Sequence, residues 1–291
     1  MTNTFRRAIS SVVLAACGAL SASAEPTKGT RPAWTFERYS DLVRATERNM
    51  NMSREAFDAV QARKPIAIAQ TKRYLASRFG EADSAVIAAF ECVPREYFHY
   101  NYERKQSSAE DAYETFGTPW PIGFGATISE YKLQCYMTQL GRPKPTDVVL
   151  EIGAGSGFQA ALFSEIVKEV YTIEIVEPLG NAVREVLKKG GYDNVRVSVG
   201  DGFYGWPEVK GGFDIIMVTC AARYVPPALI QQLKVGGRLI IPVGPPGRGG
   251  QVLYLYEKDA QGKVRSMRDL SVIFVPMTGA IDKQRETAHV E

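Results

Sequence analysis

Three features of this sequence have residue types and spacing that suit a nucleotide-like ligand. The loop Gly153-Ala154-Gly155-Ser156-Gly157-Phe158 joins an apolar run to a helical one, which is where backbone approaches such a ligand closely. Glu174 lies about 20 residues after the first glycine, where a carboxylate can accept hydrogen bonds from both ribose hydroxyls. Asp201, between Gly200 and Gly202, can accept a hydrogen bond from an adenine amino group while the glycines leave room for the ring.

The loop does not match the common phosphate-binding patterns. A dinucleotide fingerprint needs glycine where this chain has Phe158, and a phosphate loop ends in Gly-Lys-Ser/Thr. The spacing G-x-G-x-G therefore favours a ligand with a ribose and no pyrophosphate. A tight turn, a surface carboxylate and a turn residue would explain the three features singly, but all three fall at the ends of successive predicted strands. Together they predict an S-adenosylmethionine site.

The elements predicted to position these residues alternate between strands and helices after Thr146. Short apolar runs predict strands, and amphipathic runs predict helices. The predicted strands are Asp147–Ile152, Val170–Ile173, Val195–Val199, Phe213–Val218, Arg238–Val243, Gln251–Glu257 and Leu270–Val275, and the predicted helices begin at Phe158, Pro178 and Pro227. This alternation indicates a parallel sheet with helices on both faces. We expect an α/β, Rossmann-like seven-stranded sheet of the class I methyltransferase type, with C-terminal antiparallel strands.

The chain before this sheet is predicted to be helical. Candidate helices run from Phe36 to Met50, from Ser53 to Arg63 and from Ile66 to Phe79, and another begins with Ser84 as its N-cap. The aromatic and charged segment 97–118 is predicted to be a partly exposed connection. We divide the chain into a signal peptide (1–24), a helical N-terminal extension (25–83), a methyltransferase domain (84–280) and a polar tail (281–291).

The composition excludes several classes of protein. The 291 residues carry 35 Lys and Arg against 32 Asp and Glu, a net charge of +3, with no basic run of the kind that a nucleic-acid partner requires. With His99 and His289 as the only histidines and no C-x-x-C pair, we predict neither a metal site nor a histidine-based hydrolase. The four cysteines are predicted to be buried apolar residues; they are Cys17, Cys92, Cys135 and Cys220.

The N-terminus has the pattern of a secretory leader. Two arginines precede an apolar run from Ala8 to Leu20, which is too short to span a bilayer, and Ala22-Ser23-Ala24 offers a cleavage site. We expect an exported, periplasmic protein that begins at Glu25. Two alternatives stay open. Lipidation of Cys17, in the lipobox-like Leu14-Ala15-Ala16-Cys17, would tether the chain to a membrane, and a leader that does not act would leave the protein cytoplasmic.

Longer stretches resemble the protein-L-isoaspartate (D-aspartate) O-methyltransferases. The matching runs are VPREYF (93–98), PIGFGATIS (121–129), VLEIGAGSGFQAA (149–161), VYTIEIV (170–176), GYDNVRVSVGDGFYGWP (191–207), FDIIMVTCAA (213–222), VPPALIQQLKVGGRLIIPVG (225–244) and FVPMTG (274–279). They extend from about Ser84 to Gly279 and leave the extension before Gly80 unmatched. The runs GYDNV, DGxxGWP and PPALxxQLKxGGRLxIPVG are more specific than a glycine loop, because general methyltransferases do not share them.

The resemblance implies methyl esterification of the misplaced α-carboxylate of isoaspartyl residues in damaged proteins or peptides, with S-adenosylmethionine as the donor. The residues that it implies around the donor are Glu151, Gly153, Gly155, Gly157, Glu174, Asp201, Gly202 and Thr219. It places Ser129 at the active site as the catalytic residue. The acceptor contacts that it implies are Thr127, Ile128, Lys132, Val275 and Pro276. It implies no metal.

This reaction suits a chain with two histidines. A carboxylate with a pKa of about 4 is already an anion at neutral pH, so its attack on a sulfonium methyl needs no general base. Catalysis then depends on aligning the reacting atoms and on removing water from the carboxylate. The Ser129 hydroxyl or a backbone N–H can hold one carboxylate oxygen while the other attacks. Ser129 equally suits the N-cap of the predicted helix Tyr131–Leu140.

One position departs from the resemblance. The family usually continues T-I-S with a small or amide residue, then Pro, then His or Tyr, whereas this chain has Glu130-Tyr131-Lys132. Glu130 adds a negative charge where an anionic acceptor should dock, and Lys132 can offset it by pairing with Glu130 or by contacting the acceptor carboxylate. Two alternatives to isoaspartyl repair stay open: a methyltransferase of the same fold with another acceptor, and an exported binding module without catalysis.

Overall fold

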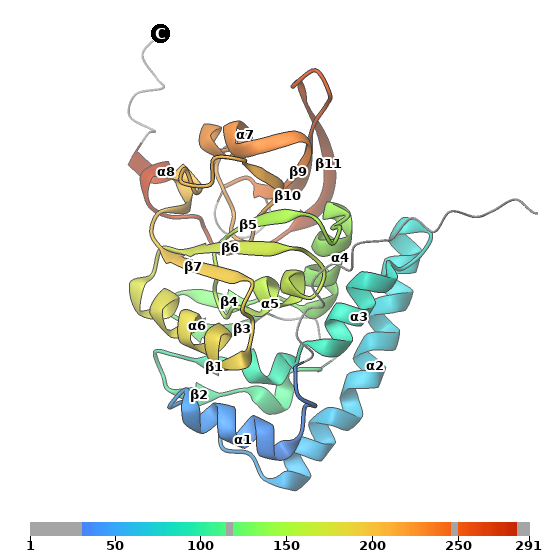
Figure 1. Ribbon diagram of the computed structural model, residues 1–291, viewed down its shortest axis with the longest axis vertical. Coiled ribbons are helices and arrows are strands. Elements are labelled where there is room, and N and C mark those ends of the chain that lie inside the picture. The colour runs from blue at the N-terminus through green and yellow to red at the C-terminus, as the bar shows by residue number, and fades with distance from the viewer. Residues whose placement is uncertain (1–30, 115–118, 246–249, 284–291) are drawn as a thin grey trace, which may run out of the picture. The chain divides into compact units, whose positions relative to one another are not determined.

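Seven strands form the central sheet of the computed structural model, which describes residues 31–114, 119–245 and 250–283 (Figure 1). The strands are β5 (Val148–Ile152), β6 (Glu169–Glu174), β7 (Val195–Val199), β8 (Phe213–Val218), β9 (Leu233–Val243), β10 (Gln251–Lys258) and β11 (Val264–Val272). Their order is β11-β10-β9-β8-β5-β6-β7. Strands β5 to β9 pair in parallel, and β10 pairs antiparallel with both of its neighbours. The predicted fold class is confirmed.

Helices cover both faces of this sheet (Figure 1). One face carries α4 (Tyr131–Gly141), α5 (Phe158–Ser164) and α6 (Glu177–Gly190), and the other carries α7 (Pro227–Gln232) and α8 (Ala280–Lys283). Neighbouring residues of β5 show the alternation, because Val149 packs in the core with α5 and α6 whereas Leu150 packs in the core with α7. The predicted helix boundaries after residue 146 agree with these to within a few residues.

The N-terminal extension differs from the prediction in detail. Its helices are α1 (Phe36–Ala45), α2 (Arg54–Phe79) and α3 (Ser84–Cys92). The predicted break near Pro65 is wrong: α2 continues through the proline, because buried Val60 and Ala67 on either side of it pack in the same core. The predicted cap of α3 is also wrong, since the side chain of Asp83, not Ser84, accepts hydrogen bonds from the first turn.

The segment 97–118 is partly exposed, as predicted, since residues 103–107 and 110 are exposed, but several of its aromatic side chains are buried. It contains the short helices η1 (Arg95–Phe98) and η2 (Ala109–Asp111) and the strand pair β1 (Tyr100–Asn101) and β2 (Gln106–Ser107). Its buried aromatic side chains are Tyr97, Phe98, Tyr100 and Tyr113. A second strand pair follows, β3 (Trp120–Gly123) with β4 (Ala126–Ile128). Aromatic density here indicates core packing, which the mixture with charged residues obscured in the sequence.

The last predicted strand has the wrong bounds. The strand is β11, which ends at Val272, and residues 273–279 continue as a segment that passes the ends of the parallel strands. Backbone hydrogen bonds fasten this segment: Ala221 N–H donates to the Val275 carbonyl and Met277 N–H donates to the Ala221 carbonyl, each at 2.8 Å. These bonds bring residues 274–278 to the site described below.

The predicted leader, its Cys17 alternative and His289 lie outside the described residues. Among the helices that the structure describes, none combines the length and apolar character needed to cross a membrane.

Candidate functional site

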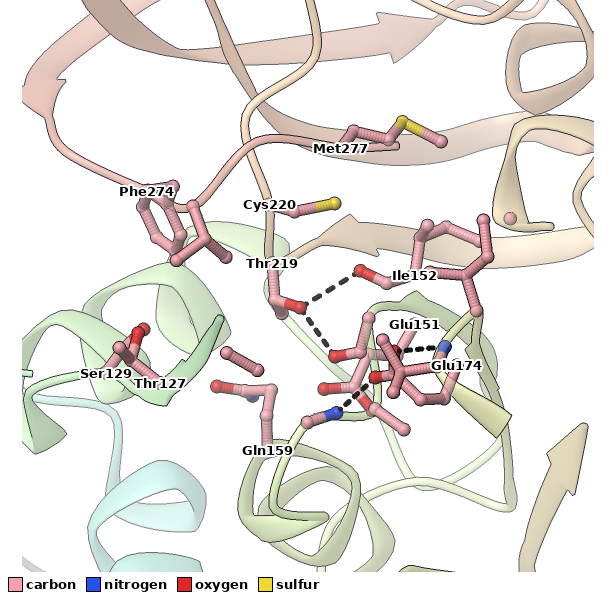
Figure 2. Close-up of a pocket in the computed structure, with 18 of the residues that line it drawn as sticks. Thr127, Ser129, Glu151, Ile152, Gln159, Glu174, Thr219, Cys220, Phe274 and Met277 are labelled. Carbon is pink, nitrogen blue, oxygen red and sulfur yellow. Dashed lines mark hydrogen bonds between the residues drawn. The ribbon is translucent and has the colours of Figure 1, made fainter. Parts of the chain in front are cut away.

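A cavity of about 390 Å³ lies at the carboxyl ends of β5, β6 and β8 (Figure 2). The loops after these strands form one wall, with residues 151–156, 173–176, 219 and 220. The other walls come from residues 124–129 at β4, from residues 274–278, and from single side chains of α4 and α5. Ligands of parallel α/β sheets bind at this position, because consecutive loops diverge there.

The first glycine of the loop lies so close to Thr219 that a side chain could not replace its hydrogen. Gly153 has a φ of 98°, and a Cβ there would lie 2.6 Å from the Thr219 hydroxyl oxygen. Thr219 in turn donates its hydroxyl to the Gly153 carbonyl at 2.7 Å and to the Ile152 carbonyl at 3.0 Å (Figure 2). The close approach of Gly153 to Thr219 and these two hydrogen bonds therefore fix the backbone of the loop at the cavity wall.

Glu174, at the end of β6, ties this loop to the neighbouring strand. One carboxylate oxygen accepts a hydrogen bond from Gly155 N–H at 2.9 Å, and the other accepts one from Val176 N–H at 3.0 Å. Each oxygen keeps a second lone pair, so the carboxylate can still accept hydrogen bonds from ribose hydroxyls.

Glu151, at the end of β5, is fully buried in the wall of the cavity. Its Oε2 accepts a hydrogen bond from the Thr172 hydroxyl at 2.6 Å, whereas Oε1 has no hydrogen-bond partner among the described residues. Burial raises the pKa of this carboxyl to about 8, and the Glu174 carboxylate adds to the rise. An unpartnered buried acceptor in a cavity wall fits a ligand that brings a cationic N–H group.

Two residues predicted around the donor do not line the cavity. A Cβ on Gly157 would lie 2.9 Å from Val183 Cγ1, so this glycine serves the packing of α5 against α6. The Asp201 carboxylate accepts hydrogen bonds from Phe203 N–H at 2.9 Å and Ala280 N–H at 2.7 Å. Asp201 thus supports the backbone beside Gly202, which does line the cavity.

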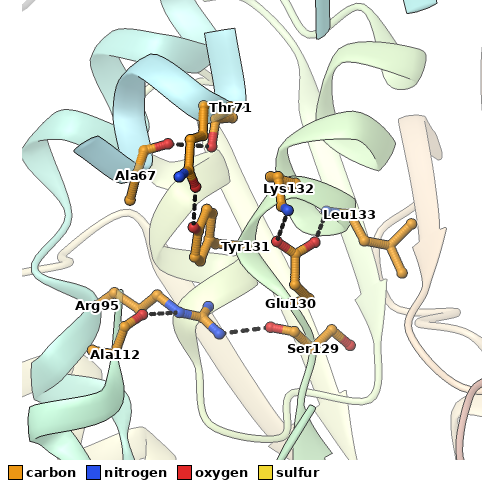
Figure 3. A network of polar contacts seen from close by, with 10 residues as sticks. Ala67, Thr71, Arg95, Ala112, Ser129, Glu130, Tyr131, Lys132 and Leu133 are labelled. Atoms are coloured by element: carbon orange, nitrogen blue, oxygen red, sulfur yellow. Dashed lines mark hydrogen bonds and ion pairs between the residues drawn. The ribbon is translucent and has the colours of Figure 1, made fainter. Parts of the chain in front are cut away.

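The predicted acceptor residues divide in the same way. Thr127, Ile128 and Ser129 line the wall opposite the glycine loop, and the segment with Val275 and Pro276 lies next to them (Figure 2). Lys132 does not line this cavity or the second cavity described below, and its ammonium lies 3.4 Å from the Glu130 carboxylate (Figure 3).

Glu130, not Ser129, caps α4, which corrects one of the two roles predicted for Ser129. The Glu130 carboxylate accepts a hydrogen bond from Leu133 N–H at 3.0 Å. Glu130 also lines a second cavity of about 780 Å³, which shares Thr127, Ser129 and Phe274 with the first. The two cavities therefore meet at the residues predicted to contact the acceptor.

Several cavity residues were missed from the sequence. Gln134 and Met137 reach the cavity from α4 and Gln159 reaches it from α5. The only available signal was a glutamine within a run of otherwise apolar buried positions, and that signal is weak. Cys220 also lines the cavity, and burial raises the pKa of its thiol to about 12. The prediction of buried cysteines is wrong for Cys92, which is exposed.

No group of acidic, cysteine and histidine side chains that could hold a metal occurs within the described part of the chain.

Comparison with known proteins identifies the family. Residues 71–282 match the family model of Protein-L-isoaspartate(D-aspartate) O-methyltransferase (PCMT). The chain belongs to this family. It is 44% identical over 227 residues to protein-L-isoaspartate O-methyltransferase 2 of Syntrophobacter fumaroxidans, an alignment that covers 77% of this chain and 88% of that one. It is 46% identical over 197 residues to the protein of the same name from a Polaromonas species, covering 68% and 89%.

Solved structures agree with this assignment. A protein-L-isoaspartate O-methyltransferase superposes with a TM-score of 0.64 at 26% identity, covering 75% of this chain and 69% of that one. A Plasmodium falciparum structure assigned to the same enzymes, in complex with S-adenosyl-L-homocysteine, gives a TM-score of 0.58 at 25% identity, covering 71% and 97%.

Proposed function

We propose that this chain transfers a methyl group from S-adenosylmethionine to the free carboxylate of L-isoaspartyl and D-aspartyl residues in damaged proteins, as a step in their repair. One observation carries the proposal. In a chain of the isoaspartate methyltransferase family, the glycine loop with its two carboxylates and the segment Thr127-Ile128-Ser129 form opposite walls of one cavity. A donor held on the first wall would present its methyl group to an acceptor on the second.

The donor side of the cavity fits a cationic nucleoside. The bound donor supplies a methyl group on a positively charged sulfur, which takes the electron pair of the broken bond. Glu174 offers acceptors for ribose hydroxyls, and Glu151 offers an unpartnered oxygen for an ammonium group. Gly202 packs so closely against Ile152 that a Cβ there would lie 2.3 Å from a methyl carbon, so only glycine fits at this position of the cavity wall.

The acceptor side needs no proton transfer. The attacking carboxylate is already an anion at neutral pH, so the residues around it have to orient it and exclude water. Ser129 and Thr127 carry the hydroxyls that can hold one carboxylate oxygen, and Phe274 provides an apolar wall. His99 is fully buried, does not line the cavity, and has a pKa held well below its usual value by burial and by Arg95. It is therefore not a general base.

The location of the protein is a separate proposal. The leader pattern in residues 1–24 supports export to the periplasm, with cleavage after Ala24. Cell fractionation and mass measurement of the purified chain test it. A mature chain that begins at Glu25 agrees with the proposal, a lipidated Cys17 would indicate membrane tethering, and an intact leader in the cytoplasm would contradict export.

The test of the proposed activity is transfer of labelled methyl from S-adenosylmethionine to an isoaspartyl peptide and to its aspartyl twin. We expect base-labile label on the isoaspartyl peptide only, with inhibition by S-adenosylhomocysteine. Glu130 favours one competing hypothesis, a methyltransferase of the same fold with another acceptor, because its negative charge borders the acceptor side of the cavity and opposes an anionic isoaspartyl residue. Donor binding without transfer to the isoaspartyl peptide would support that hypothesis and contradict ours.

A further inference from the structure

Arg95 lies directly behind the wall that carries Ser129, with 1% of its surface exposed. Its guanidinium donates a hydrogen bond to the Ser129 carbonyl at 2.6 Å (Figure 3). It donates another to the Gln134 side-chain oxygen at 2.6 Å. A third hydrogen bond, from Arg95 Nε to the Ala112 carbonyl at 3.0 Å, fixes the other side of the guanidinium. Since Ser129 and Gln134 both line the cavity, Arg95 holds two of its wall residues from behind.

All three of these acceptors are neutral, so Arg95 brings a buried positive charge that they do not cancel. The guanidinium carbon lies over the Phe158 ring, 4.8 Å from its centre. Burial lowers the pKa of Arg95 to about 10, which leaves it a cation at neutral pH. Among the described residues, no carboxylate forms a salt bridge with it, and Glu130 is the carboxylate whose charge acts on it most strongly.

The charge of Glu130 acts on this buried cation and also on a second, half-buried one, Lys132. One of its carboxylate oxygens caps α4, and the other lies 3.4 Å from Lys132 Nζ without forming a hydrogen bond. The three side chains together carry one net positive charge next to the acceptor side of the cavity. Removal of the Glu130 charge alone would make this local charge more positive.

We propose that Arg95 is a positioning residue that draws the anionic acceptor to Ser129, and that Glu130 moderates this attraction. The inference rests on the proposed function and deepens it by naming what sets the affinity for the acceptor. Arg95 acts through the backbone of Ser129 and the side chain of Gln134, and through the field of its charge. The departure at Glu130 then weakens acceptor binding without disturbing the donor wall.

The positive charge stabilises the bound acceptor more than it stabilises the transition state. As the carboxylate oxygen bonds to the methyl carbon, the bond from carbon to sulfur breaks and its electron pair stays on sulfur. The acceptor loses its negative charge in this step, so a nearby positive charge stabilises the bound anion more than the transition state. Since the acceptor keeps part of its charge in the transition state, a change in the nearby charge should move KM and kcat in the same direction, with the larger effect on KM.

The test begins with Glu130→Gln in the full chain. Glutamine keeps an oxygen that can accept from Leu133 N–H, so the cap of α4 survives while the charge is lost. We expect the KM for an isoaspartyl peptide to fall about fivefold with kcat within about twofold of its original value. Glu208→Gln, at an exposed carboxylate outside both cavities, is the matched control and should leave KM unchanged.

A neutral probe separates charge from shape. An isoasparaginyl peptide, which has an amide in place of the carboxylate, is used as a competitive inhibitor, and its inhibition constant should be equal for the original chain and Glu130→Gln. Arg95→Gln should raise the KM for the isoaspartyl peptide about tenfold, and Arg95→Lys, which keeps the charge, should restore part of the loss. Affinity for S-adenosylhomocysteine checks that each variant is folded.

The outcomes distinguish the inference from the function on which it rests. No turnover of the isoaspartyl peptide by the original chain would overturn both. Turnover with an unchanged KM in Glu130→Gln, or an equal shift for the isoasparaginyl probe, would overturn the inference alone.

Discussion

At the scale of single residues, the two carboxylates on the donor wall differ in their hydrogen bonds. Glu174 accepts two backbone N–H groups, whereas Glu151 accepts one hydroxyl and leaves Oε1 without a partner among the described residues. Glu174 thus shapes the glycine loop as well as offering lone pairs to a ligand. Glu151 accepts fewer hydrogen bonds, and its burial raises the pKa of its carboxyl.

Glu174→Gln should weaken donor binding. A glutamine has one acceptor oxygen, so its amide group would face either Gly155 N–H or Val176 N–H, and a ligand hydroxyl would lose a charged acceptor. We expect the dissociation constant for S-adenosylhomocysteine, measured by calorimetry, to rise at least about tenfold, or about 1.4 kcal/mol. The exposed Glu177→Gln is the control, and equal affinities for the two variants would contradict the assigned role.

Glu151 should make the donor-free protein less stable as pH rises. Its folded pKa of about 8 exceeds the ordinary value of 4.5, so the unfolded chain releases this proton at a lower pH than the folded chain. The stabilising contribution is complete below about pH 4.5 and is lost as pH rises toward 8. Glu151→Gln, which has no charge to bury, should gain stability over the original chain across this range by on the order of a few kcal/mol.

Urea unfolding at about pH 5 and about pH 8 measures this effect. The difference in free energy of unfolding between Glu151→Gln and the original chain should increase from the lower pH to the higher. A difference that stays constant with pH would mean that Glu151 is ionised in the folded protein.

The site residues that could be predicted from the sequence are those that directly follow a predicted strand. Gly153 and Glu174 follow strands in a recognisable spacing, so their meeting at one cavity was predictable. Gln134 and Gln159 lie within helices, and which helical face meets a cavity depends on tertiary packing that periodicity does not specify. Arg95 falls within a run that matches the family, yet nothing in its neighbours along the chain indicated its bond to Ser129.

At the scale of elements, the third glycine of the loop connects the site to the helices that support it. Gly157 has a φ of 85° at the start of α5 and lies against Val183 of α6. This contact gives Gly157 a role in the packing of α5 against α6, and its predicted role beside the donor stays a prediction.

Gly157→Ala should destabilise the fold by about 2–4 kcal/mol, because the left-handed backbone and the contact with α6 each add a penalty. Gly80→Ala is the matched control, since Gly80 has a φ of 87° and a methyl group added there would have no atom within 4 Å, so this variant should lose only the backbone part. Chemical denaturation of the two variants measures the difference. Equal losses would show that the packing against Val183 has no energetic weight.

Local patterns predicted most of the elements and failed where packing overrules them. The alternation after residue 146 was readable because each buried strand is short and each helix has one apolar face. Pro65 predicted a break between two helices. Helix α2 is continuous there because residues on both sides of the proline pack in one core. The end of β11 was misplaced because the apolar residues after Val272 line the cavity rather than continue the strand.

At the scale of the whole molecule, a buried carboxylate in η1 connects the N-terminal extension to the segment that follows η1. Glu96 accepts hydrogen bonds from Trp34 Nε1 and Gln61 Nε2, both at 2.6 Å, and from the Tyr113 hydroxyl at 2.8 Å. These partners come from the N-terminal extension and from the segment after η1. The extension is therefore part of the same compact unit as the sheet.

Glu96→Ala should lower the free energy of unfolding by about 3 kcal/mol, because it leaves one buried and two half-buried donors without this acceptor. We expect unfolding to stay a single transition, with tryptophan fluorescence and circular dichroism giving the same midpoint. An early separate transition, in which the extension unfolds while the sheet stays intact, would contradict this integration.

The order of the strands could not be read from periodicity, because alternation shows that strands exist and not which ones are neighbours. The placement of β8 beside β5 was therefore not predicted. The burial of the extension was likewise hidden, since the matching family model begins at residue 71, within α2.

The central claim is that the cavity joins a donor wall to a wall that selects isoaspartyl carboxylates. A competition assay tests it most directly: the full chain is given S-adenosylmethionine and an equal mixture of isoaspartyl, aspartyl and glutamyl peptides of one sequence, and methyl esters are located by mass spectrometry. We predict a single methyl group, on the isoaspartyl residue of that peptide alone. Methylation of all three peptides at similar rates, or of none while the donor binds, would contradict the account.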